Sequence, residues 1–112
     1  MIYQSHSDIE NVVRGFETCE TDKDAFNHRD HLVVAVWYVE TVGREAADRM
    51  RSSLFRFLDH HGVDRKKYSE TITVFWIGKV ADKLNSLGSD MSLVEKCRQV
   101  VESPDFQKDK GL

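Results

Sequence analysis

Proline and cysteine are scarce in this chain, and long apolar runs are absent. Its 112 residues include one proline and two cysteines. Cys19 and Cys97 are too few for a disulfide framework, so we expect reduced thiols in a cytoplasmic protein. The longest uninterrupted apolar run, residues 32–39, is too short to span a bilayer. The first residues lack the charged start and apolar stretch of a signal peptide. These absences exclude a disulfide-rich secreted scaffold and a membrane span.

Charge is balanced rather than one-sided. Hydrophobic residues make up 40% and charged residues 31% of the chain, with a net charge of -3. This composition is typical of a soluble globular protein, and its length fits one domain over residues 1–112. No basic excess points to nucleic acid or to an anionic membrane surface as a partner. The basic run at residues 65–67 is short and is expected to be a solvated turn.

Hydrophobic spacing predicts helices and no convincing strand. The expected helical segments are approximately residues 7–20, 28–41, 44–61, 69–87 and 92–102. The second is valine-rich and could be mistaken for a buried strand, but its length and the following Gly43 favour a helix. A helix that is apolar on every side is normally central. Short connections favour antiparallel neighbours, so we predict an all-α, up-down antiparallel helical bundle of four to five helices.

A histidine-rich bundle end follows from that topology. His28 and His31 are one helical turn apart on one face. Alternating helix directions bring the starts of the second and fourth helices to the same end as the end of the third. This count adds His60, Tyr68 and Glu70 to the pair. Two helix N-termini would keep the histidines neutral and favour an ionised Glu70 or a bound anion.

This group of residues is a candidate metal site. Two histidines and one carboxylate suit zinc or iron, so His28, His31 and Glu70 are the expected ligands. His60 is preferred as a fourth ligand over His61, which precedes a glycine and is expected to point outward. The HxxH spacing alone is a weak signal, because zinc proteases use HExxH. A metal-free pocket for a small anion and purely structural histidines, with Glu70 capping its helix, are the alternatives.

Aromatic residues offer a second candidate site. Trp37 and Trp76, with Tyr68 at the start of the fourth helix, are candidate lining of a ligand pocket. Aromatic residues at helical spacing more often belong to the core. We therefore expect both tryptophans to be buried and structural.

The pattern Phe-Asn-His-Arg-Asp-His-Leu at residues 26–32, followed by Glu-Thr-Ile-Thr at residues 70–73, resembles a family of small bacterial all-helical proteins. The resemblance covers roughly residues 26–84 and implies a shared pattern, since no activity is known for the family. Similar chains carry histidine before the glutamate, where this chain has Ser69. His60 or Tyr68 would have to replace that group. Similar chains also continue further, so we expect a shortened form.

Two functions remain open at this point. The first is a small soluble protein whose histidine-rich end binds a divalent metal or a small anionic ligand, as a hydrolase-like or oxygen-using enzyme would. The second is a non-enzymatic interaction domain with structural histidines, in which a helix face binds a second copy or another partner. Stoichiometric metal in purified protein would favour the first function.

Overall fold

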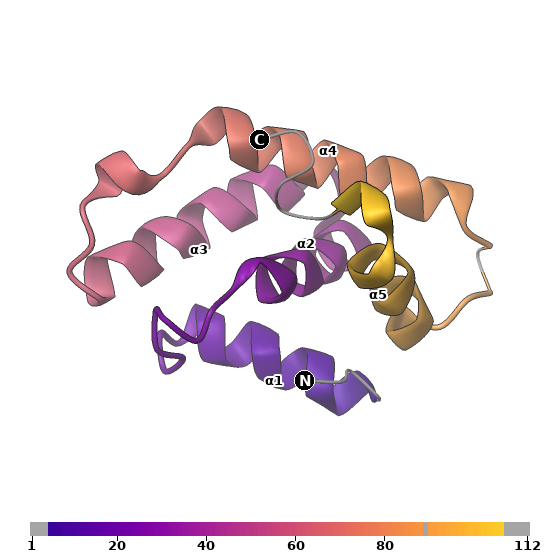
Figure 1. The fold of residues 1–112 in the computed structure, drawn as a ribbon, viewed down its shortest axis with the longest axis horizontal. Coiled ribbons are helices and arrows are strands. Elements are labelled where there is room, and N and C mark those ends of the chain that lie inside the picture. Colours follow the sequence, from indigo (N-terminus) through magenta and orange to yellow (C-terminus); the bar gives the residue numbers. More distant parts are fainter. Residues whose placement is uncertain (1–4, 89, 107–112) are drawn as a thin grey trace.

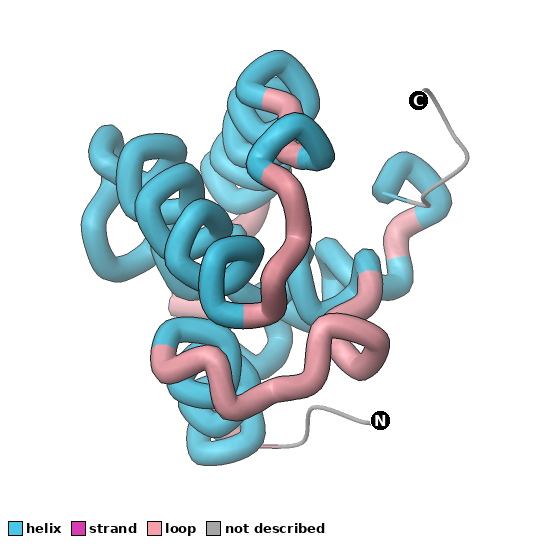
Figure 2. Tube along the Cα trace, turned by 90° about the vertical axis from the view of Figure 1, so that its left-hand side faces the viewer, coloured by secondary structure: helices cyan, strands magenta, loops and turns pink. Residues whose placement is uncertain are grey.

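The computed structural model describes residues 5–88 and 90–106, and this part of the chain is helical without any strand (Figure 2). Its α-helices are α1 (His6–Glu17), α2 (His28–Val42), α3 (Ala46–His60), α4 (Glu70–Ser86) and α5 (Leu93–Glu102). Short 3-10 turns occupy Gly43–Glu45 (η1), Arg65–Lys67 (η2) and Pro104–Phe106 (η3). The all-α prediction is confirmed. Within the described ranges, no helix has the length and apolar character needed to cross a membrane.

Side-chain caps set the helix starts. Asn27 caps α2, accepting from the backbone N–H of Asp30 at 3.1 Å while the Asp30 side chain accepts from the Asn27 backbone N–H at 3.2 Å. Ser5 caps α1, its side chain accepting from the backbone N–H of Asp8. Gly43 follows α2 with a φ of 58°, a conformation that favours glycine.

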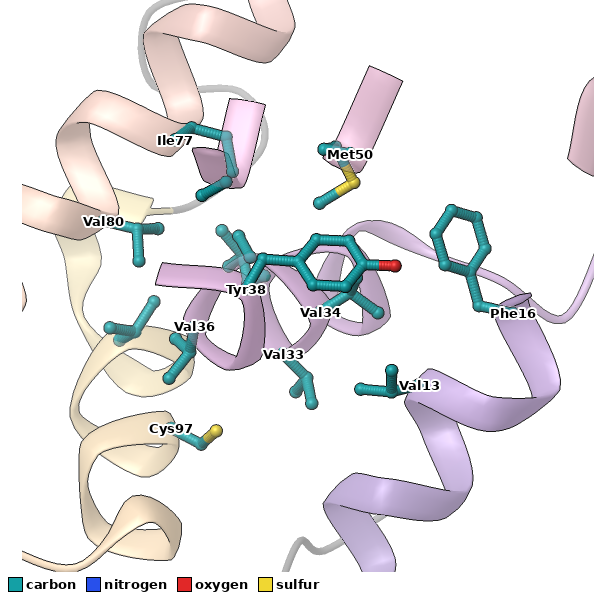
Figure 3. Close-up of a cluster of buried hydrophobic side chains, with 14 of the residues drawn as sticks. Val13, Phe16, Val33, Val34, Val36, Tyr38, Met50, Ile77, Val80 and Cys97 are labelled. Atoms are coloured by element: carbon teal, nitrogen blue, oxygen red, sulfur yellow. The ribbon is translucent and has the colours of Figure 1, made fainter. Parts of the chain in front are cut away.

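The core is built around α2. This helix contacts α1, α3, α4 and α5, and it lies in the middle of the molecule (Figure 1). Its sides are apolar all round, and Val33, Val34 and Val36 are completely buried. Around them lie Val13 of α1, Ile77 and Val80 of α4 and Cys97 of α5 (Figure 3). The prediction that the second helix is central is therefore confirmed.

One polar contact inside the core joins three helices. The Tyr38 hydroxyl of α2 donates to Glu17 Oε2 of α1 at 2.6 Å and lies 2.9 Å from Ser53 Oγ of α3. Burial, followed by the hydrogen bond to Glu17, raises the pKa of Tyr38 above its usual range. Because these buried polar atoms satisfy one another, α2 is held in register with its neighbours.

Candidate functional site

Glu70, the predicted carboxylate ligand, is bound to other side chains. Arg51 of α3 grips it with two hydrogen bonds, Nε to Oε1 at 2.8 Å and Nη2 to Oε2 at 2.9 Å. The Tyr68 hydroxyl donates to the same carboxylate at 2.7 Å. These donors, Arg51 first, lower the pKa of Glu70 to about 2. The Glu70 carboxylate therefore anchors the start of α4 to α3.

His28 faces a different part of α4. Its Nε2 lies 2.8 Å from the backbone carbonyl of Phe106, and its ring meets the Trp76 ring edge-on with centroids 5.1 Å apart. Trp76 is six residues beyond Glu70, which is about 9 Å along the axis of a helix. The start of α2 therefore lies beside the middle of α4 rather than beside its first turn.

His31 and His61 flank a cluster of phenylalanine rings. The His31 ring lies 4.5 Å from the Phe26 ring, and the His61 ring lies 4.5 Å from the Phe57 ring. Phe26 and Phe57 are themselves 5.3 Å apart. The expectation that His61 points outward is wrong, because His61 is half-buried while His60 is exposed. Within the described part of the chain, the buried His61 Nε2 has no hydrogen-bond partner.

The four candidate ligands His28, His31, His60 and Glu70 do not converge. Among residues 5–88 and 90–106, no group of three or more histidine, cysteine, aspartate or glutamate side chains is placed to hold a metal ion. The reason is that α4 is displaced along α3, so its start does not lie beside the end of α3. The connection at residues 61–69 returns along α3, so α4 starts beside Arg51, about 13 Å along the helix from His60. The zinc or iron site thus stays a prediction from sequence without support from these contacts.

The aromatic pocket residues also have separate surroundings. Trp37 meets the ring of His6 at 5.6 Å, and Tyr68 meets Phe55 at 4.8 Å. Both tryptophans pack against the core but are only partly buried, so the expected burial is found in part. A shallow depression elsewhere, between α1 and the chain that precedes α2, is lined by Asn11, Val12, Thr21, Ala25, Phe26 and Asp30.

The outward side of α4 is a feature that the sequence analysis missed. Ile72, Val74 and Phe75 are 42%, 48% and 45% exposed. The opposite side of the helix is buried through Thr73, Ile77, Val80 and Leu84. Hydrophobic spacing could not separate the two sides, since α4 is apolar on both.

A cationic and aromatic cluster lies next to this face. The Lys79 ammonium is 5.6 Å from the centroid of the Phe75 ring, 5.1 Å from that of Trp76 and 5.2 Å from that of Phe106. It also donates to the backbone carbonyl of Asp105. Since Phe106 is remote in sequence, no spacing pattern could have predicted this contact.

Comparison with known protein-family models, curated proteins and solved structures gives no match for this chain. The resemblance described above therefore rests on the pattern of residues alone. The functional argument has to come from the contacts and exposed surfaces of the molecule itself.

Proposed function

We propose that the protein is a helical interaction domain that binds another protein through the outward side of α4. The supporting observation is that α4 has the sequence of a buried helix but is exposed on one side. A helix that is apolar on every side is normally buried on every side. α4 has such a sequence, yet it lies along one edge of the molecule (Figure 1) and leaves three large apolar side chains exposed.

The proposed binding face, which we term the α4 ridge, consists of Thr71, Ile72, Val74, Phe75 and Gly78, all exposed. Three partly exposed apolar side chains offer on the order of a few hundred Å², well below the roughly 800 Å² per partner of a stable interface. An area of this size fits one helix of a partner better than a broad domain surface. Apolar anchors at helical spacing would meet the ridge in that arrangement.

The charges around the ridge favour an acidic partner helix. Lys66 and Lys67, just before α4, are exposed, and among the described residues their side chains have no ion pair or hydrogen bond. Lys79 lies over Phe75. The nearby Glu70 is already paired with Arg51. Because the cations around the ridge exceed the free carboxylates, Asp or Glu flanking the partner's apolar anchors would complement them. Asp82, one helical turn beyond Gly78, is exposed on the same side of α4 and marks the end of the apolar ridge.

Gly78 also supports a close partner. Glycine in the middle of a helix costs about 1 kcal/mol relative to alanine. A Cβ atom added at Gly78 would meet nothing within 4 Å, so packing inside the chain does not require glycine there. A partner backbone that approaches the ridge closely would require it.

The test is titration with a designed probe, an amphipathic helix of about four turns with leucine anchors flanked by glutamate. We expect fluorescence anisotropy to detect binding to the native chain. Val74→Asp should weaken it at least about tenfold, equal to about 1.4 kcal/mol. Asn11→Asp, which adds the same charge on exposed α1, is the matched control and should bind like the native chain.

A second probe with lysine in place of glutamate tests the charge argument. Equal binding of both probes would contradict an acidic partner. Sedimentation velocity tests the remaining occupant, a second copy of the chain, and we expect a monomer. The chain could instead form a concentration-dependent dimer that Val74→Asp abolishes. That result would show that the ridge binds a second copy of the chain, and it would contradict an acidic partner helix.

The up-down order of the helices also belongs to this proposal. It is supported by α3 and α4, which contact each other and run in opposite directions (Figure 1). Paramagnetic relaxation from a spin label on the exposed His60 at the end of α3 would test it. Because α4 starts beside Arg51, antiparallel helices carry the middle of α4 away from the label, whereas parallel helices would bring it alongside and broaden its amides.

A further inference from the structure

The turn η3 is held by His28 of α2 and by Trp76 and Lys79 of α4, and we term the space that Phe106 fills beside them the groove. Phe106 is 2% exposed, although it lies in a three-residue turn after α5. Its ring packs against Trp76 with centroids 6.0 Å apart. Its carbonyl lies 2.8 Å from His28 Nε2, and the preceding carbonyl, that of Asp105, accepts from Lys79. The start of α2 and the middle of α4 together hold these two residues.

The chemistry of the groove is that of a peptide site. His28 and Lys79 bind consecutive backbone carbonyls, which any peptide offers. Trp76 contributes an aromatic surface for one ring, and the Lys79 ammonium lies over both the Trp76 and Phe106 rings. Main-chain hydrogen bonds with one side-chain pocket are a common way of recognising short peptide segments. The groove therefore selects a segment with an aromatic side chain and two free carbonyls.

The attachment of η3 is local. Pro104 and Asp105 are exposed, and α5 ends just before them. The ring of Phe106 is the one buried side chain of the turn. A short turn held by one ring and two hydrogen bonds can open without unfolding the α2 core.

We propose that the groove of His28, Trp76 and Lys79 is a binding site for a short aromatic peptide segment in a turn conformation, which the chain's own Asp105–Phe106 occupies as a releasable latch. A partner segment with the same chemistry displaces the latch. This site adjoins the α4 ridge and shares Lys79 with it, but its ligand is different, so the two tests can fail independently.

The experiment adds the segment back in trans. The probe is the capped tetrapeptide Ser-Pro-Asp-Phe, and the readout is the indole N–H resonance of Trp76, with that of Trp37 as internal control. In Phe106→Ala we expect a saturable shift of Trp76 alone, absent with the control peptide Ser-Pro-Asp-Ala. The native chain should bind at least about tenfold more weakly, because its groove is filled. Binding to neither protein, or to both equally, would overturn the proposal.

Hydrogen exchange in the native chain gives a second result that needs no variant. The Phe106 amide donates to the Ser103 carbonyl at 3.1 Å, so its exchange reports the state of the turn. A releasable latch predicts exchange at least about 100-fold faster than at Val36 in α2, with little dependence on denaturant. Equal protection of the two amides would show that the turn opens only with the whole fold, and would contradict the latch even if Phe106→Ala failed to fold.

Discussion

α2 and α4 are equally apolar helices in different surroundings. α2 contacts every other helix, and Val33, Val34 and Val36 are completely buried. α4 packs by one side only, and Val74 on its other side is 48% exposed. The difference teaches that an all-round apolar sequence indicates a helix with several neighbours, and that one of these neighbours can be missing from the isolated chain. The α4 ridge is where we place the missing neighbour.

The same valine-to-aspartate substitution in each helix should give the largest contrast. Val34→Asp places a carboxylate with no partner in the core and should cost more than about 4 kcal/mol, a large part of the stability of a small domain. Val74→Asp adds a charge at the surface and should change the free energy of unfolding by less than about 0.5 kcal/mol. Chemical denaturation followed by helical circular dichroism measures both. Similar losses would mean that the ridge is covered.

The two tyrosine hydroxyls sharpen the comparison between core and surface. Tyr38→Phe leaves Ser53 and Glu17 without their buried partner and should cost about 1–2 kcal/mol. Tyr68→Phe removes one donor from the exposed Glu70 carboxylate, which keeps both bonds from Arg51. It should change the free energy of unfolding by less than about 0.5 kcal/mol. Denaturation midpoints of the two variants would contradict this ranking if Tyr68→Phe lost more.

The central position of α2 could be predicted from sequence because it depends on local signals. The Asn27 cap, the apolar body and the Gly43 stop all lie within one segment. The candidate metal site required the end of α3 and the starts of α2 and α4 to lie at the same height along the bundle axis. The path of residues 61–69 sets the position of α4 along that axis. The sequence of that connection has no turn or spacing signal from which its path back along α3 could be predicted. His28 and Trp76 share the partner Phe106, which lies too far away in the chain to be inferred from the sequence.

Two glycines in helix interiors should respond differently to replacement by alanine. Gly78→Ala should raise the free energy of unfolding by about 0.5–1 kcal/mol, because alanine favours the helix and the added Cβ meets open space. Gly15→Ala should gain less or lose, because the Cβ would collide with the Thr21 hydroxyl. Thermal unfolding of the pair measures the difference. If the glycine serves the partner, Gly78→Ala should also weaken the glutamate-flanked probe, whereas unchanged affinity would argue against close backbone approach.

The Arg51–Glu70 pair predicts a small pH dependence at the start of α4. The folded-state pKa of Glu70 is about 2, below its usual 4.5. Its contribution to stability is therefore complete above pH 4.5 and is lost as the pH falls toward 2. Both side chains are substantially exposed, so salt should reduce the effect. Glu70→Gln should remove this part of the pH dependence in denaturation curves, and an unchanged curve would contradict the assigned pair.

Amide chemical-shift mapping of the glutamate-flanked probe on the native chain tests the central claim most directly. The account predicts saturable shifts at residues 70–79 of α4 and in the adjoining η2 turn, with the amides of α2 at residues 32–38 unchanged. Shifts confined to another surface, or no shifts at probe concentrations that saturate the anisotropy titration, would contradict the assignment of the α4 ridge as the binding face.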